Sequence, residues 1–217
     1  FGIDWLPSLL ATRDKGGDIV NIAQVFTRSG MTELTWKTRG INTIKKMAGK
    51  KVGVWCCGNE NELFAALVKN GINPKDPKSV TIVNQPLDMT LFLQNKVDAA
   101  AAMTYNELAQ VLETKNPDTG KLYTLADLNV ITMERAGTAM LEDGVFAQGA
   151  WLKDTKNQDI AKRFLAASFK GWAYCRDNQK ACVDIVLKNG TLLGRGHQTW
   201  QMNEINKLIW PAPAGIG

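Results

Sequence analysis

The chain has 217 residues, of which 45% are hydrophobic and 22% charged. These are ordinary globular values, and they exclude a disordered, collagen-like or coiled-coil chain. The 26 basic and 21 acidic residues give a net charge of +5, but the excess is scattered and lacks the basic, aromatic-lined face of a nucleic-acid-binding protein. The longest apolar-leaning run, Val97–Met103, is too short to span a bilayer. We therefore expect a soluble globular chain without a nucleic-acid partner.

Both ends of the sequence indicate a fragment or a mature chain trimmed at each end. Phe1 falls inside a strand pattern, with no initiator Met and no signal peptide before it. The last residues, Trp210–Gly217, follow no closing helix or strand. We expect that any signal peptide lies outside this chain, so its absence here says nothing about localisation.

Strand and helix patterns alternate along the first two thirds of the chain. Period-two or compact apolar runs predict strands at residues 2–5, 19–26, 32–37, 51–55, 80–84, 97–102 and 128–132, with an extended segment at 140–151. Helical spacing of apolar residues predicts helices at residues 6–12, 41–47, 61–69, 89–94, 105–113, 158–176, 181–188 and 199–210.

This order predicts an α/β fold with two lobes. Strands that alternate with helices favour a parallel sheet covered by helices. Residues 41–137 form one such self-contained pattern, which we assign to lobe II. Residues 1–40 and 138–217, whose last part is helical, are then expected to share lobe I. Two lobes joined by two crossing segments are typical of proteins that close over a ligand by a hinge.

Four cysteines allow three pairings if all are oxidised. Cys56 and Cys57 are adjacent, and a disulfide between neighbours is strained, so we do not expect one. Cys175 and Cys182 flank a polar break between two helical patterns, and an oxidising compartment would allow them to pair. Two half-buried thiols are the open alternative. The spacing does not fit a zinc site, and with a single His we predict no bound metal.

The loop after the strand at 51–55 is the first candidate ligand site. Open α/β sheets bind ligands beyond the carboxyl ends of their strands. Asn59 followed by Glu62 fits a helix capping box, the purely structural explanation for both residues. Gly58 frees backbone N–H groups to bind a ligand, and Glu60 is expected to point outward toward it.

Two further strand ends carry candidate ligand-binding residues. Thr104 and Glu107 fit a second capping box, which leaves Tyr105 and Asn106 free to contact a ligand; the structural alternative is that Tyr105 packs on its own lobe. Asp4 and Trp5 end the first strand, and an exposed Trp beside a carboxylate suits a nitrogen heterocycle, although Asp4 could be only a helix cap.

Catalysis has little support in the sequence. The chain has no nucleophile elbow, P-loop, zinc-protease helix motif or dinucleotide fingerprint. His197 is the single histidine, and it lacks a sequence partner that would make it a base. Glu142 and Asp143 are neighbours in an extended segment, so their side chains point to opposite faces and one of them is expected to meet the ligand. We predict no catalytic residue and no cofactor.

Several of these motifs resemble one known family. The stretches Phe1–Pro7, Ala48–Trp55, Gly58–Glu60, Met103–Glu107 and Gly196–Asn203 are similar to the NMT1/THI5-like group of substrate-binding proteins of ABC transporters. The resemblance covers essentially the whole chain, although runs such as Gly-Lys-Lys-Val-Gly-Val occur in many solute receptors. In that family a first βαβ segment precedes the position of Phe1, so the resemblance implies that this segment is absent here.

The resemblance implies a type II periplasmic-binding-protein fold with the ligand between two α/β lobes. It also implies a monomeric, periplasmic or lipid-anchored receptor that delivers its solute to an inner-membrane permease without making or breaking a bond. The solute in this group is a flat heterocycle, such as a formylaminopyrimidine precursor of thiamine or riboflavin. The ligand-binding residues expected on this basis are Asp4, Trp5, Gly58, Asn59, Glu60, Tyr105, Asn106 and Glu142.

Two other functions remain open. A self-consuming pyrimidine synthase, the eukaryotic activity of the group, needs its own His and a pyridoxal-binding Lys in the cleft beside a cysteine-rich cluster. A receptor for sulfonates or nitrate needs an Arg or Lys aimed at the ligand, and Arg28 is the one candidate near a hinge.

Overall fold

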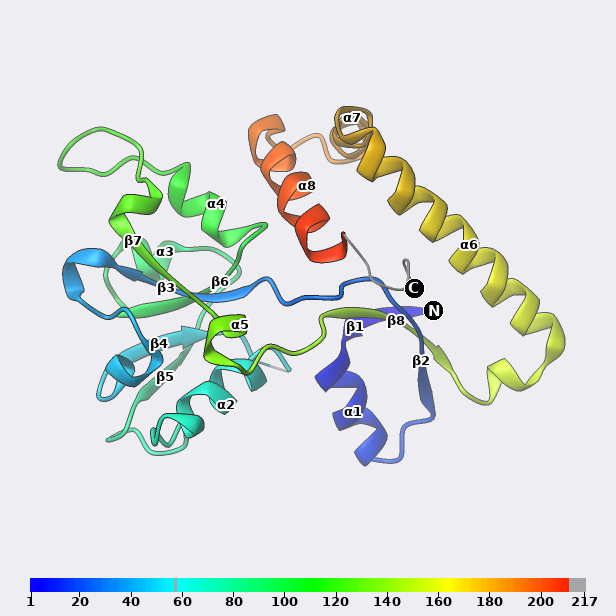
Figure 1. Ribbon diagram of the computed structural model, residues 1–217, viewed down its shortest axis with the longest axis horizontal. Helices are drawn as coiled ribbons and strands as arrows, with labels where there is room; N and C mark the ends of the chain where they lie inside the picture. The colour runs from blue at the N-terminus through cyan, green and yellow to red at the C-terminus, as the bar shows by residue number, and fades with distance from the viewer. Residues whose placement is uncertain (57, 211–217) are drawn as a thin grey trace. The chain divides into compact units, whose positions relative to one another are not determined.

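The computed structural model describes residues 1–56 and 58–210, and these form two compact units. Unit 1 comprises Phe1–Arg28 together with the chain from Met140 onward, and unit 2 comprises Ser29–Ala139. Each unit has its own sheet and its own helices (Figure 1).

Unit 2 is built on a five-stranded sheet of order β5-β4-β6-β3-β7. Strand β4 is parallel to β5 and β6, whereas β3 is antiparallel to both β6 and β7. The sheet is therefore mixed, and the expectation of a parallel sheet holds only for its three parallel strands. The strand bounds are β3 Met31–Trp36, β4 Lys51–Val54, β5 Thr81–Asn84, β6 Ala99–Met103 and β7 Leu128–Thr132.

Helices cover both faces of the sheet of unit 2, with α2 on one face and α3 and α4 on the other (Figure 1). Helix α2 buries Leu63, Ala66 and Leu67, which share one face of the helix because they are spaced by three and four residues. Helix α3 packs by stacking Phe92 on Trp36 at 4.5 Å between ring centroids. The helix bounds are α2 Asn61–Lys69, α3 Thr90–Leu93, α4 Glu107–Leu112 and α5 Met133–Ala136, with short 3-10 turns at Lys37–Arg39, Ile44–Met47 and Leu125–Asp127.

Unit 1 contains a three-stranded sheet of order β1-β8-β2. The central strand β8, Asp143–Gln148, is antiparallel to both β1, Gly2–Trp5, and β2, Ile19–Gln24. Helix α1, Leu6–Asp14, connects the two outer strands and packs against them. The sheet thus combines strands from the start of the chain with a strand from the segment that follows unit 2.

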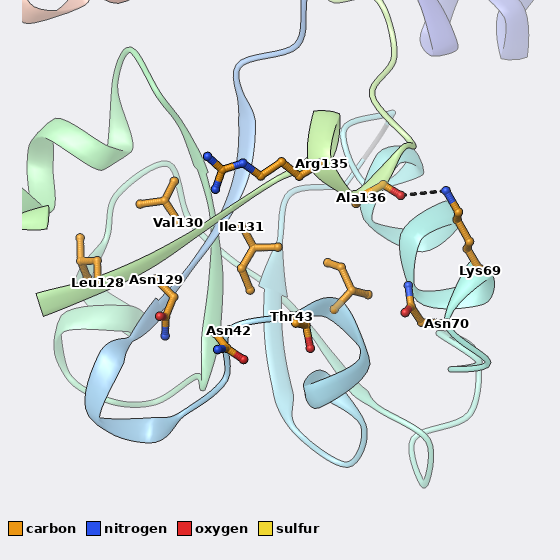
Figure 2. Close-up of a pocket in the computed structure, with 11 residues that line it drawn as sticks. Asn42, Thr43, Lys69, Asn70, Leu128, Asn129, Val130, Ile131, Arg135 and Ala136 are labelled. Atoms are coloured by element: carbon orange, nitrogen blue, oxygen red, sulfur yellow. Dashed lines mark hydrogen bonds between the residues drawn. The ribbon is translucent and has the colours of Figure 1, made fainter. Parts of the chain in front are cut away.

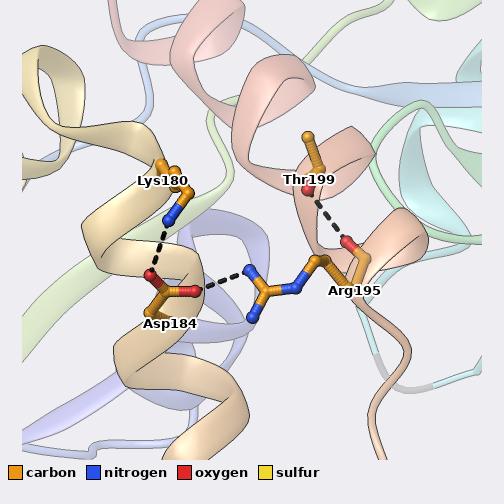
Figure 3. Close-up of polar contacts among 4 residues, drawn as sticks. All are labelled: Lys180, Asp184, Arg195 and Thr199. Carbon is orange, nitrogen blue, oxygen red and sulfur yellow. Dashed lines mark hydrogen bonds and ion pairs between the residues drawn. The ribbon is translucent and has the colours of Figure 1, made fainter.

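Three helices, α6 Thr155–Asp177, α7 Gln179–Asn189 and α8 Arg195–Ile209, follow a 3-10 turn at Trp151–Lys153 and complete unit 1. A disulfide joins Cys175 in α6 to Cys182 in α7, the pair that the sequence allowed. Asp184 in α7 accepts from Lys180 Nζ of the same helix at 3.4 Å and from Arg195 Nη1 of α8 at 2.6 Å (Figure 3). The bond to Arg195 links α7 to α8. The hydrogen bond from Arg195 is the main cause that lowers the pKa of Asp184.

The sequence identified each major element, but it placed one boundary between the lobes wrongly. We assigned residues 1–40 to lobe I, whereas β3 lies between β6 and β7 in the sheet of unit 2. All six residues of β3 are buried. Buried backbone N–H and C=O groups need hydrogen-bond partners, and β3 finds them in the strands on both of its sides, β6 and β7. Residues 29–40 therefore belong with 41–137. The other boundary, at 138, lies close to the observed one at Met140.

None of the helices in the described part of the chain combines the length and the apolar character needed to cross a bilayer.

Candidate functional site

The carboxyl ends of the parallel strands β4, β5 and β6 lie at one edge of the sheet of unit 2. The start of β3 lies at the same edge, because Met31 pairs with Met103 at the end of β6. The predicted loops at 58–60 and 104–106 both leave this edge and lead into α2 and α4. Such an edge, where loops feed helix starts, is the usual ligand site of an open α/β sheet.

The first loop is held by hydrogen bonds within itself. Glu60 Oε2 accepts from the backbone N–H of Gly58 at 2.7 Å, and Asn61 Nδ2 donates to the Gly58 carbonyl at 2.9 Å. The expectation that the Gly58 N–H is free for a ligand and that Glu60 points outward is therefore wrong, because the two bind each other. Helix α2 begins at Asn61, without a side-chain cap. The predicted capping box of Asn59 and Glu62 is therefore wrong. Asn59 is half-buried in the loop, so its amide is available to a ligand.

Glu62 is fully buried, and a residue distant in the sequence forms a hydrogen bond with its carboxylate. The hydroxyl of Ser29 donates to Glu62 Oε2 at 3.0 Å and in turn accepts from the N–H of Met31 at 3.1 Å. This chain of bonds fixes the start of β3 against the first turn of α2. Residues far apart in sequence make it, so the local pattern around Glu62 gave no sign of it.

The second loop has a similar buried carboxylate. Glu107 accepts from the N–H of Met103 at 2.9 Å and from Asn106 Nδ2 at 2.6 Å. The helix begins at Glu107 itself, with Asn106 as its N-cap residue, so the predicted capping box of Thr104 and Glu107 is also wrong. Tyr105 precedes the helix and is half-buried. Part of this residue is therefore exposed.

Two further side chains at this edge, Trp55 and Gln85, are buried. Trp55 is 8% exposed, and its indole N–H donates to the Pro86 carbonyl at 3.1 Å. Gln85 was not predicted as a residue of this edge. Its Nε2 donates to the Ala101 carbonyl at 2.8 Å, and its Oε1 accepts from the Ala101 N–H at 3.0 Å. These residues support the edge, whereas Tyr105 and the loop at 58–60 remain at its surface. Cys56 is disulfide-bonded, contrary to expectation, and Cys57 lies outside the described residues.

The corresponding edge of unit 1 gathers carboxylates. Trp5 at the end of β1 pairs with Asp143 at the start of β8, and Asp4 pairs with Gly144. Gln24, at the end of β2, donates to the Glu142 carbonyl at 2.9 Å and was not predicted. Residues from three strands thus meet at one end of this sheet.

Asp143 has a raised pKa at this edge. Burial raises its pKa first, and the nearby charge of Asp4 raises it further. Both causes favour a neutral carboxyl, and both would be relieved by a hydrogen-bond donor or a cation placed beside the pair. Asp4 is exposed and lines a pocket of about 340 Å³ on the sheet with Gly2, Ile19 and Phe146.

Two expectations about this edge change. Trp5 is buried at 8% exposure, so it does not present the open face that we expected beside Asp4. Of the neighbours Glu142 and Asp143, Glu142 is fully buried and Asp143 is half-buried, so the more accessible carboxylate is Asp143. Asp4 does not cap α1: the N-cap residue is Trp5, and Asp4 Oδ1 accepts from the adjacent N–H of Trp5 at 2.7 Å.

The two edges have polar and acidic side chains but a poor set of ligands for a metal or pyridoxal phosphate. Among the described residues no cluster of His, Cys, Asp and Glu could hold a metal ion. The described strand-end loops, residues 25–27, 55–60, 85–89, 104–106 and 140–142, contain no lysine for a Schiff base. The single His197 lies in the first turn of α8 and not in a strand-end loop. The residues present therefore do not fit a pyridoxal phosphate site.

A comparison with protein families identifies the chain. Residues 1–182 match the family described as NMT1/THI5 like. The chain belongs to the NMT1/THI5-like family. The match includes both edges described above, and it agrees with the resemblance that the motifs indicated. No curated protein matches the chain significantly.

Solved structures similar to this NMT1/THI5-like chain include periplasmic binding proteins. The alkanesulfonate-binding protein SsuA from Xanthomonas axonopodis pv. citri, bound to MOPS, is 14% identical with a TM-score of 0.67, over 94% of this chain and 65% of that one. The periplasmic aliphatic sulphonate binding protein SsuA from Escherichia coli is 16% identical with a TM-score of 0.67, over 89% and 58%. The chain spans less than two thirds of either protein. At this identity the likeness shows the fold, a mixed α/β fold of the kind found in periplasmic binding proteins.

Proposed function

We propose that this chain is the solute-binding component of an ABC importer and that its solute is a small aromatic heterocycle with N–H donors. A pyrimidine precursor of thiamine and a riboflavin-like compound are the two candidates. In this role the protein makes and breaks no bond. It acts as a monomer outside the cytoplasm, in the periplasm or anchored by lipid, and passes its solute to a permease of the inner membrane.

The observation that supports this solute class most is the acidic edge of unit 1. Burial raises the pKa of Asp143, and the nearby charge of Asp4 raises it further. A ring amine or amide N–H that donates to Asp143 stabilises its carboxylate, and such a bond to a charged acceptor contributes roughly 1.5–3 kcal/mol.

Unit 2 supplies the aromatic and neutral polar groups for the same solute class. Tyr105 is half-buried beside Asn106 at the end of β6, and stacking on a Tyr ring is worth about 0.5–1.5 kcal/mol beyond the buried area. The loop of Gly58, Asn59 and Glu60 adds amide and carboxylate oxygens. We assign the buried Trp5, Trp55 and Glu142 a supporting role.

A receptor for sulfonates is the second candidate, because the similar structures include sulfonate-binding proteins. A sulfonate would meet Asp4 and Asp143 at the edge of unit 1, which disfavours an anion. Arg28, the cation that we considered for it, donates to Thr27 Oγ1 and to the Lys207 carbonyl, both at 3.3 Å. The electrostatics of the described residues therefore favour the heterocycle.

A titration of the intrinsic Trp fluorescence with formylaminopyrimidine, riboflavin and taurine tests the proposal. We expect saturable binding of one of the two heterocycles and none of taurine. Tyr105→Ala is expected to weaken the binding, while Tyr105→Phe, which keeps the ring, is the matched control. Saturable binding of taurine alone would contradict the proposal and favour a receptor for sulfonates.

A further inference from the structure

Strand β7 forms an open edge of the sheet of unit 2. It pairs only with β3 in the described part of the chain. In an antiparallel pair about half of the backbone N–H and C=O groups of a strand point away from its neighbour. Within the described residues, the backbone groups of β7 that point away from β3 have no backbone partner. An exposed row of this kind is a template for one more strand.

A groove of about 700 Å³ runs beside this edge (Figure 2). Strand β7 supplies one wall, and the segment at Asn42–Ile44 and the end of α2 at Lys69–Asn70 supply the other. Five residues of extended strand span about 17 Å at ~3.4 Å per residue. The groove lies along residues 128–131 of β7, where a segment paired with this strand would run.

The charge of the groove points to an anionic occupant. Its lining residues include Lys69 and Arg135, and none of the eleven described ones is Asp or Glu. Lys69 Nζ is fixed in place, because it donates to the Ala136 carbonyl at 3.0 Å (Figure 2). Arg135 is exposed at the end of β7, and no described residue accepts a hydrogen bond from its guanidinium.

Amide side chains complete the lining. Asn129 Nδ2 donates to Thr35 Oγ1 and to the Ile41 carbonyl, both at 3.1 Å, so its amide is held at the base of the strand. Asn42 is exposed on the opposite wall, and its side chain makes no hydrogen bond to a described residue. An amide in this position can accept from or donate to the backbone of an added strand.

We propose that the β7 edge of unit 2 binds an extended peptide segment of a partner protein and that a carboxylate of this segment pairs with Arg135. The backbone of the segment bonds to the outward groups of β7, which supplies most of the affinity, as in other cases of strand addition. Arg135 selects a segment with a carboxylate, since guanidinium and carboxylate groups can form two parallel hydrogen bonds. The site lies within unit 2 and does not depend on the solute that the protein carries.

The test is a selection from a display library of random eight-residue peptides on the whole protein. We expect the recovered peptides to share an Asp or Glu within an extended, β-branched sequence. Their affinity is expected to fall at least tenfold for Arg135→Gln. Lys75→Gln, which removes one exposed positive charge elsewhere in unit 2, is the matched control and should leave the affinity unchanged. Circular dichroism checks that both variants keep the fold.

Backbone pairing has its own test. A recovered peptide is resynthesised with N-methyl groups on its even or on its odd residues, so that only one set blocks the pairing edge. We expect one version to lose at least tenfold in affinity and the other to keep it. The proposal is wrong if no peptide is recovered, if Arg135→Gln binds as well as the parent, if both methylated versions bind equally, or if free aspartate competes as strongly as the peptide.

Discussion

Glu33 offers a sharp test of the packing in unit 2. Its side chain is fully buried in β3, and neither carboxylate oxygen has a hydrogen-bond partner. It points away from Trp36 and α3, because residues an odd number apart in a strand face opposite sides. Burial raises the pKa of Glu33 well above its usual range. Burial therefore favours the neutral form of this carboxyl in the folded protein.

The direction of the pH dependence follows from this pKa. The folded protein binds the Glu33 proton more tightly than the unfolded chain, so the full stability is present below the ordinary Glu pKa of about 4.3. Between that value and the raised folded pKa, the free energy of unfolding falls by up to about 1.4 kcal/mol for each pH unit. Above the folded pKa the loss stops growing.

Glu33→Gln removes the titration and keeps the volume. We expect the variant to lose the Glu33 part of the slope, so that its stability relative to the parent rises as the pH increases from 5 to 8. Urea unfolding followed by circular dichroism at each pH measures this difference. The exposed Glu113→Gln serves as the control and should follow the parent. The reasoning is refuted if the stability difference between Glu33→Gln and the parent is the same at each pH.

Three further predictions concern the site and the disulfide. Tyr105→Ala should weaken binding of the heterocycle about 2- to 13-fold, the equivalent of a stacking loss of about 0.5–1.5 kcal/mol, in a calorimetric titration; unchanged affinity would remove Tyr105 from the site. In the parent, affinity should fall as the pH is lowered, because protonation of Asp143, whose pKa is raised, removes the charged acceptor. Asp143→Asn should bind more weakly and show a smaller fall in affinity at acidic pH; an unaltered pH profile would contradict this role. Removal of the Cys175–Cys182 bond in the variant Cys175→Ala/Cys182→Ala should lower the free energy of unfolding by roughly 2–3 kcal/mol in urea unfolding without reductant, which leaves the bond of Cys56 in place; thiols that react at Cys175 and Cys182 in the unreduced parent would show that the bond is absent.

Elements with strong local patterns could be predicted from the sequence. The helix at Asn61–Lys69 was predicted with its observed bounds because its apolar spacing and the following Asn70-Gly71 are local signals. Gly71 has a φ of +76°, which a glycine adopts without strain. The strand at Leu128–Thr132 was likewise placed correctly.

Features that depend on pairing over long sequence distances could not be predicted. Strand β3 reads as part of the N-terminal segment, and only its pairing with β6 and β7 places it in unit 2. Glu62 fits a capping box in the sequence, but the hydroxyl of Ser29 binds it instead. Asp143 approaches Asp4 because β1 and β8 pair although they come from opposite parts of the chain. A local pattern carries no information about such partners.

The most direct test of the proposed function is a competition measurement. The protein is dialysed to equilibrium against an equimolar mixture of formylaminopyrimidine, riboflavin and taurine, and the excess of each compound on the protein side is measured by mass spectrometry. We predict an excess of one heterocycle, reduced for Tyr105→Ala in unit 2 and for Asp143→Asn in unit 1. An excess of taurine alone, or a heterocycle excess that neither variant reduces, would contradict the account.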